Sequence, residues 1–397
     1  MKKVFIYICM GHLFWAISIQ SQTRKALVIQ PIIDLVGQPL PTPNDAYHQL
    51  PIAGSNGACA RLHQLLYNEV VNIIKEKNDQ YCIEVPDIFY ITTANTTPQR
   101  TFWTHKNHLM PLEDIPQAAH AHIPALQKNK EITLIMPWES KQLACTFSAG
   151  TRFVIAQGKA RPRHLQVYAY DTRTKKSRTL WIPTHVCIQM ESIDTQKKRE
   201  HYCHLLRTWA HMPGLIPYVW GGCSLTYLHK KNATFQTIPI NKQEQCVAYS
   251  YADEPPQKSG VDCAGLITRA AHTAGLIYPY KNTTTLAHYL TPVPSYDACE
   301  NGDLIWIPGH VMAIGNKEKG LIIEARHYSH GYGKVQEIPL ARIFKGITSC
   351  DMLFAHIAQK KPLERLDVHG KVIQRITNAK ILSMNSCIEG WSSSPAA

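Results

Sequence analysis

Two short motifs in this sequence contain the side chains of a thiol nucleophile and its base. Cys263 lies within residues 262–266, and His310 lies within residues 309–311. The thiolate is the attacking form of a cysteine, so the chemistry needs a lowered thiol pKa and a neighbouring base. Unpaired N–H groups at a helix start can lower that pKa, and an imidazole can be the base. We therefore expect Cys263 to attack a carbonyl carbon, while His310 takes the thiol proton and returns it to the leaving amine.

A third side chain should orient the imidazole. Two predicted strands meet at a turn over residues 316–320. Because side chains alternate along a strand, a turn centred on this segment would place Glu324 diagonally opposite His310, within reach of its second ring nitrogen. A shift of one residue in register would place His327 there instead. Glu324 is the predicted third member, and His327 is the alternative.

Further residues are expected to line the same site. Asp262 directly precedes the cysteine and can cap the predicted helix or bind a substrate ammonium group. Residues 218–222 contain Tyr218 and Trp220, followed by two glycines. Each feature taken singly is weak and is more typical of packing than of chemistry. The order and spacing of the whole set carry the hypothesis.

The elements around these residues predict an α+β unit. Residues 199–212 and 263–274 have helical spacing and helix-ending residues after them. The polar stretch at residues 223–260, which lies between the aromatic and cysteine motifs, is interpreted as an insert. Three strands should follow, at residues 303–307, 311–314 and 321–325. We expect helices packed on an antiparallel sheet.

The first half of the chain is rich in predicted strands. Short apolar runs recur from residue 23 to about 115, among them a hairpin with its turn at residues 75–79. A similar pattern follows from about 130 to 190. Short strands at this spacing are typical of small barrels. We expect two small β-barrels, at residues 22–115 and 116–195.

The N-terminus has the layout of a secretory signal peptide. Lys2 and Lys3 precede an apolar run at residues 4–17, and small or polar residues follow. We assign residues 1–21 as the signal peptide. This predicts an exported protein of the periplasm or cell envelope, with no integral membrane span after cleavage. Residues 361–397 are assigned as a C-terminal tail.

Composition restricts the partners. The formal net charge of +13 is compatible with general solubility and with attraction to anionic envelope polymers. No nucleic acid partner is expected, because the sequence has no recognisable binding motif. The spacings of the histidines and cysteines match no standard zinc site, so neither a metal nor a cofactor is predicted. The 12 cysteines predict no particular disulfide, and the oligomeric state stays open.

Residues 196–360 resemble the NlpC-type family of papain-like cell-wall cysteine peptidases. The motifs that carry the resemblance are residues 218–222, 261–266, 302–305, 309–311 and 323–325. The two N-terminal units resemble bacterial SH3-like domains. The architecture is similar to that of γ-D-glutamyl-L-diamino acid endopeptidases, which cut peptidoglycan stem peptides. The resemblance implies a catalytic set of Cys263, His310 and Glu324, and a substrate-binding set of Asp262, Trp220 and Tyr218, with Asp262 holding a free substrate amine.

Two departures from the family pattern affect this interpretation. Ala264 stands where the family usually has Ser, often a ligand of that amine, so the requirement for a free L-Ala terminus stays open. Glu324 stands where the family usually has His, although a carboxylate can do the same orienting work. The prediction is an exported cysteine endopeptidase acting on peptidoglycan or muropeptides. The alternatives are an amidase or acyltransferase with the same Cys–His chemistry, and a non-catalytic peptidoglycan-binding protein.

Overall fold

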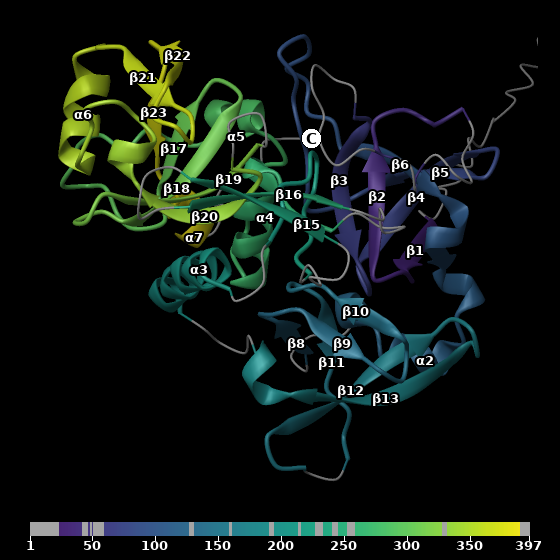
Figure 1. Ribbon diagram of the computed structural model, residues 1–397. Helices are drawn as coiled ribbons and strands as arrows, with labels where there is room; N and C mark the ends of the chain where they lie inside the picture. The colour runs from purple at the N-terminus through teal and green to yellow at the C-terminus, as the bar shows by residue number, and fades with distance from the viewer. Residues whose placement is uncertain are drawn as a thin grey trace, which may run out of the picture.

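The computed structural model contains three units that follow one another along the chain (Figure 1). The assigned signal peptide, residues 1–21, lies outside the described residues. Among the helices of the described part, none is long and apolar enough to cross a membrane. The structure describes residues 24–41, 47, 50, 59–126, 131–158, 161–189, 194–212, 216–226, 233–239, 245–251, 259–327 and 332–389, and all structural statements concern these residues.

The first unit is an antiparallel sheet of seven strands in the order β3-β2-β6-β5-β4-β1-β7. The strands are β1 (Arg24–Val28), β2 (Ile32–Val36), β3 (Arg61–Leu66), β4 (Val70–Lys77), β5 (Gln80–Glu84), β6 (Thr101–His105) and β7 (Leu109–Pro111). The predicted hairpin is β4–β5, which turns at Asn78 with φ +52°. Asparagine adopts this left-handed conformation more readily than most residues. Within the described strands, β3 and β7 do not pair with each other, so the barrel form stays a prediction.

The second unit consists of short strands in three separate antiparallel sheets. The strands are β8 (Glu131–Leu134), β9 (Trp138–Ser140), β10 (Cys145–Phe147), β11 (Arg152–Val154), β12 (His164–Asp171), β13 (Lys176–Pro183) and β14 (Cys187–Gln189). Apolar side chains of all three sheets share one core with Tyr67 of the first unit. The Tyr67 hydroxyl also donates to the carbonyl oxygen of Tyr170 at 2.8 Å. The first two units are therefore packed on each other.

The third unit packs helices on both faces of a five-stranded antiparallel sheet, green to yellow in Figure 1. Its strands, in spatial order, are β20 (Lys334–Pro339), β19 (Leu321–Arg326), β18 (His310–Asn316), β17 (Leu304–Ile307) and β23 (Lys380–Leu382). Val311 and Ala313 pack in a core with helices α3 (Thr195–Ala210) and α4 (Cys263–Thr273). The alternating Met312 and Ile314 pack with α6 (Cys350–Ala358) on the other face. The α+β prediction is confirmed for this unit.

The predicted helix over residues 199–212 begins earlier in the structure. The Asp194 side chain accepts a hydrogen bond from the backbone N–H of Lys197 at 2.9 Å and so caps α3 at its N-terminus. The second predicted helix, α4, starts at Cys263 as expected. A third helix, α5 (Thr283–Tyr289), follows it. Helix starts therefore follow the capping residues more closely than the apolar periodicity.

Residues 361–389 belong to the third unit, so their assignment as a C-terminal tail is wrong. Strand β23 extends the sheet by pairing with β17. Strands β21 (Leu363–Leu366) and β22 (Val372–Ile376) form a further hairpin. Helix α7 (Asn385–Glu389) contributes Cys387 and Ile388 to the core beside α3. The residues of β22 are mostly exposed, which explains why this segment lacks the apolar pattern of a folded element.

The predicted insert at residues 223–260 contains an antiparallel hairpin of β15 (Ala233–Pro239) and β16 (Gln245–Tyr251). Its two ends are joined at the base. The Ser224 backbone N–H donates to the Gly260 carbonyl at 3.1 Å, and the hydroxyls of Ser224 and Ser259 lie 3.1 Å apart. The hairpin is thus held at the point where the chain enters the cysteine motif.

Candidate active site

Cys263 is the first residue of α4, and the sequence places it there through its cap. The Asp262 carboxylate accepts a hydrogen bond from the Gly265 backbone N–H at 2.5 Å, which closes the first turn. The backbone N–H of the first helical residue has no partner within the helix. Such a group is available to a negative oxygen that develops on a carbonyl carbon under attack.

The Cys263 thiol is buried, with 7% exposure. Burial, and next the negative charge of Asp262, raise its pKa to about 12. A backbone hydrogen bond from Val311 and the charge of Lys281 act in the opposite direction and only partly offset this rise. The backbone N–H of Ala264 at the helix start lowers the thiol pKa as expected, but the net pKa is raised, because burial of the thiolate outweighs this effect.

His310 is placed by a tight turn between β17 and β18. Ile307 pairs with His310, and Pro308 and Gly309 lie between them. Proline followed by a residue with positive φ suits a two-residue turn, and Gly309 has φ +79°. The turn leaves His310 at the start of β18, next to Val311, whose backbone reaches the Cys263 sulfur.

The predicted contact between His310 and Glu324 is present. His310 Nε2 lies 2.8 Å from Glu324 Oε2, and both side chains are buried. The pKa of Glu324 is about 2, because the charge of Arg326 and the hydrogen bond to His310 outweigh the effect of burial. An ionised carboxylate only accepts hydrogen bonds, so Nε2 must carry the imidazole proton. The free lone pair is then on Nδ1.

Two buried arginines share this carboxylate. Arg326 Nη1 lies 3.6 Å from Glu324 Oε1, and Arg365 Nη2 lies 4.0 Å from Oε2. The Gln336 side chain donates to Oε1 at 3.3 Å. Burial, together with the positive charge of Arg365, lowers the pKa of His310 to about 4. His310 is therefore neutral at neutral pH and can accept a proton.

No hydrogen bond joins Cys263 to His310 in the described residues. The sulfur lies instead beside the Val311 backbone, one position along the chain from the imidazole. Both groups are uncharged at neutral pH, since their pKa values are about 12 and about 4. The arrangement holds a protonated thiol near a neutral base, and transfer of the proton requires the two side chains to come into hydrogen-bonding distance.

The other predicted residues surround this pair. His327, the alternative third member, packs edge-on against Tyr218 at 5.1 Å and Trp220 at 6.5 Å between ring centroids. Tyr218 is buried, whereas Trp220 is 36% exposed. Trp220 is thus the one of these aromatic side chains that presents a substantial surface to solvent. Asp262 Oδ2 accepts from the Gly221 N–H at 3.0 Å and lies 3.8 Å from the buried ammonium of Lys281.

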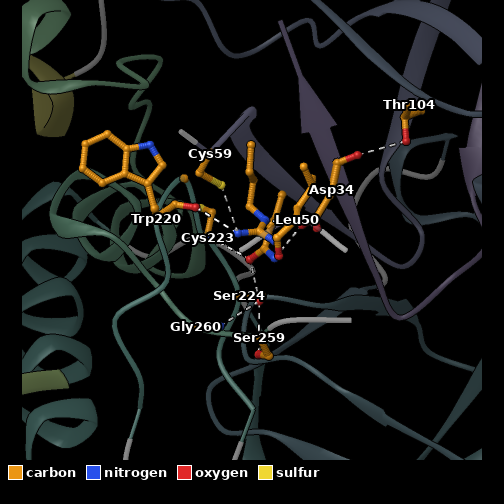
Figure 2. Close-up of polar contacts among 12 residues, drawn as sticks. Asp34, Leu50, Cys59, Thr104, Trp220, Cys223, Ser224, Ser259 and Gly260 are labelled. Atoms are coloured by element: carbon orange, nitrogen blue, oxygen red, sulfur yellow. Dashed lines mark hydrogen bonds and ion pairs between the residues drawn. The ribbon is translucent and has the colours of Figure 1, made fainter. Parts of the chain in front are cut away.

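The first unit contacts the Trp220 segment through a buried polar cluster (Figure 2). Arg61 forms an ion pair with Asp34 at 2.8 Å and donates to the Trp220 carbonyl oxygen at 3.1 Å. Gln64 Oε1 accepts from the Cys223 backbone N–H at 2.9 Å. In Figure 2 the Trp220 carbonyl is turned toward this cluster and its indole ring points away. The first unit therefore positions the loop that precedes the cysteine helix.

Other polar groupings do not join this site. A cavity of about 500 Å³ lies along α3, is lined by Arg199, Cys203 and Glu300 among others, and contains none of the predicted site residues. In the described part of the chain, no group of three or more His, Cys, Asp or Glu side chains could hold a metal ion. Nine cysteines whose side chains are described, Cys263 among them, are free thiols.

The comparison with solved structures identifies the fold. An NlpC/P60 family protein from Bacillus cereus superimposes with a TM-score of 0.52 at 15% sequence identity, covering 80% of this chain and 94% of that chain. The described chain has an NlpC/P60-like fold. NlpC2 from Trichomonas vaginalis matches with a TM-score of 0.31, 12% identity and coverage of 80% and 94%. The peptidoglycan hydrolase RipB from Mycobacterium tuberculosis matches with a TM-score of 0.24, 23% identity and coverage of 36% and 59%.

In the comparisons by sequence, no family model and no curated protein matches the chain. The roles of the individual side chains therefore rest on the geometry described above.

Several residues of the candidate active site were not predicted from the sequence. Arg326 could have been found, because it lies two positions after Glu324 on the same face of a strand. Lys281 and Arg61 approach from elements that carry no local signal of chemistry. Arg365 lies in the segment assigned as a tail, where no motif directs attention to it. Long-range ion pairs of this kind become visible only when the fold is known.

Proposed function

We propose that the protein is an exported cysteine endopeptidase that hydrolyses peptidoglycan stem peptides, at the bond between γ-D-glutamate and the diamino acid. The observation that carries the proposal is the buried 2.8 Å contact of His310 with Glu324, beside a cysteine at the start of α4. The NlpC/P60-like fold supports the substrate class. The N-terminal signal motif supports export to the envelope.

The roles follow from the protonation states. Glu324 holds the Nε2 proton of His310, so Nδ1 takes the thiol proton as Cys263 attacks the amide carbon. The sulfur–carbon bond forms while the carbonyl electrons move to the oxygen, which the Cys263 backbone N–H stabilises. His310 then gives the proton to the leaving amine, and water releases the acyl group from sulfur by the reverse sequence.

The first two units are proposed to be SH3-like domains that restrict access to the cleft. The Arg61 contact with the Trp220 carbonyl supports this role, because it fixes one wall of the site. Trp220, with a third of its surface exposed, is the candidate contact for substrate.

One observation favours the alternative of a non-catalytic peptidoglycan-binding protein. The Cys263 thiol is buried with a raised pKa and makes no hydrogen bond to His310 in the described structure. The two proposals differ in the outcome of one experiment. Purified protein is incubated with tripeptide, tetrapeptide and N-blocked tripeptide stem fragments, and the products are identified by mass spectrometry.

The enzyme proposal expects a new amine at the diamino acid and complete loss of cleavage in Cys263→Ala, with the circular dichroism spectrum unchanged. Cleavage that survives Cys263→Ala would refute the nucleophile. Binding of all three fragments without any product would favour the non-catalytic alternative.

A further inference from the structure

The hairpin β21–β22 supplies a charged group to the candidate active site. Arg365 lies on β21, and its side chain is 5% exposed. The hairpin is attached to the rest of the third unit by a bridge between Phe344 and Arg365 and by the Leu366 N–H, which donates to the Ile343 carbonyl at 2.8 Å. Arg365 is therefore held in place by backbone contacts and does not reach the site on a flexible arm.

The guanidinium of Arg365 is directed at the same oxygen that binds the imidazole. Its Nη2 lies 4.0 Å from Glu324 Oε2, and that oxygen lies 2.8 Å from His310 Nε2. Within the described residues, Arg365 Nε has no hydrogen-bond partner. A buried guanidinium normally uses its fork of donors fully. Here the guanidinium makes a charge–charge contact with Glu324, while Nε is left without a partner.

The charges around His310 come from two strands of different sheets. Glu324 and Arg326 lie on β19, and Arg365 lies on β21. One carboxylate thus faces two guanidiniums. On the α4 side, Cys263 is next to the Val311 backbone, and its negative form would be favoured by Arg365. A surplus positive charge beside the imidazole disfavours the imidazolium, which agrees with the lowered pKa of His310.

A purely stabilising role explains this arrangement poorly. Replacing buried ion pairs by apolar residues often leaves a protein as stable or more stable. Two buried cations on one anion are a less favourable case still. Both guanidiniums keep the Glu324 carboxylate ionised. The ionised carboxylate in turn holds the proton on Nε2 of His310.

We propose that Arg365 is a positioning residue of the candidate active site: it holds the Glu324 carboxylate ionised and aligned, so that the carboxylate fixes His310 with its Nδ1 lone pair free. The inference rests on the proposed function, because it assigns Arg365 a part in that reaction. It makes the C-terminal segment part of the catalytic unit.

The test compares Arg365→Met, which removes the charge, with Arg365→Lys, which keeps it. Arg375 is exposed on the partner strand β22, so Arg375→Met is the matched control. Stem-peptide cleavage is measured from pH 4 to 8 as kcat and KM. In Arg365→Met we expect the acidic limb of kcat/KM to move up by about one pH unit, since a like charge near a base shifts its pKa by one or more units.

Loss of alignment should lower kcat at the pH optimum by about tenfold or more, with little change in KM. Arg365→Lys should keep the acidic limb of the wild type, and Arg375→Met should match the wild type throughout. An acidic limb and kcat unchanged in Arg365→Met would overturn the proposal. If Arg365→Met does not fold, Arg365→Gln takes its place. Identical pH profiles of kcat/KM for Arg365→Gln and Arg365→Lys would then overturn the proposal.

A second readout separates this inference from the proposed function. The titration of His310 is followed by NMR of ¹³C-labelled histidine, with its signal assigned by its loss in His310→Gln. If the wild type cleaves no stem peptide, the proposed function fails, and the titration still decides the role of Arg365. A higher His310 pKa in Arg365→Met supports the electrostatic part, whereas an unchanged pKa refutes it.

Discussion

Replacing Glu324 with Gln should slow cleavage far more than replacing His327 with Gln. The 2.8 Å contact with His310 is buried and charge-assisted, and such a bond contributes about 1.5–3 kcal/mol. If this contribution is lost from the transition state, kcat/KM falls by about 10- to 150-fold, since 1.36 kcal/mol corresponds to a factor of ten. His327 contacts Tyr218 and Trp220, so its replacement should change KM more than kcat.

The assay is steady-state cleavage of a stem tetrapeptide by wild type, Glu324→Gln and His327→Gln. Glu324→Gln also leaves Arg326 and Arg365 without a counter-charge, so its free energy of unfolding should fall by about 3–5 kcal/mol. Rates are therefore normalised to the folded fraction, measured by urea unfolding. If His327→Gln costs more kcat than Glu324→Gln, or if Glu324→Gln retains near-wild-type turnover, the assignment of Glu324 as the orienting residue is wrong.

Three other predictions concern the same centre. Gly221→Ala should destabilise the protein by about 2–4 kcal/mol in denaturant unfolding, because Gly221 has φ +69° and a Cβ there would lie 2.3 Å from the Arg61 carbonyl oxygen. The control is Gly309→Ala, where φ is also positive but a Cβ would meet open space. This control should cost only about 1 kcal/mol. Blocking the amino terminus of a stem peptide should change kcat/KM less than about threefold, since the Asp262 carboxylate already binds two backbone N–H groups and faces a lysine; a requirement for the free amine would contradict this. The pKa of His310 is lowered from 6.5 to about 4, so its contribution to stability is complete above pH 6.5 and is lost as the pH falls toward 4. Urea unfolding at pH 7.5 and 4.5 should therefore show that the free energy of unfolding falls less with pH in His310→Gln than in the wild type.

The parts of the fold that were predictable are those with local signals. Helix α4 starts where an aspartate caps it, and the hairpin of β4 and β5 turns at an asparagine. The diagonal relation of His310 and Glu324 follows from strand alternation and the position of one turn. The barrel form of the N-terminal units was not predictable to the same degree, because closure depends on pairing between strands far apart in sequence.

The electrostatic surroundings of the site were beyond sequence reasoning for a related reason. Arg365 stands 41 positions after Glu324, in a hairpin whose outer strand is exposed. Neither spacing nor composition indicates that its charge reaches the imidazole. The net thiol pKa was not predictable either, since the sequence does not reveal how deeply the sulfur is buried, and burial outweighs the lowering effect of the helix start. Burial and long-range charge set the protonation states, and both depend on the complete fold.

The protonation states imply how the centre would work. With Cys263 at a pKa of about 12 and His310 at about 4, the resting site holds neither a thiolate nor an imidazolium. In the proposed reaction, the charge separation would then arise as the substrate carbonyl enters and its oxygen meets the N–H at the start of α4, which can stabilise the new negative charge. In such a site, the Cys263 thiol stays protonated and the His310 imidazole stays neutral over a wide pH range. In the proposed reaction, burial of both groups and the charge of Arg365 beside His310 would therefore favour a proton transfer that accompanies attack.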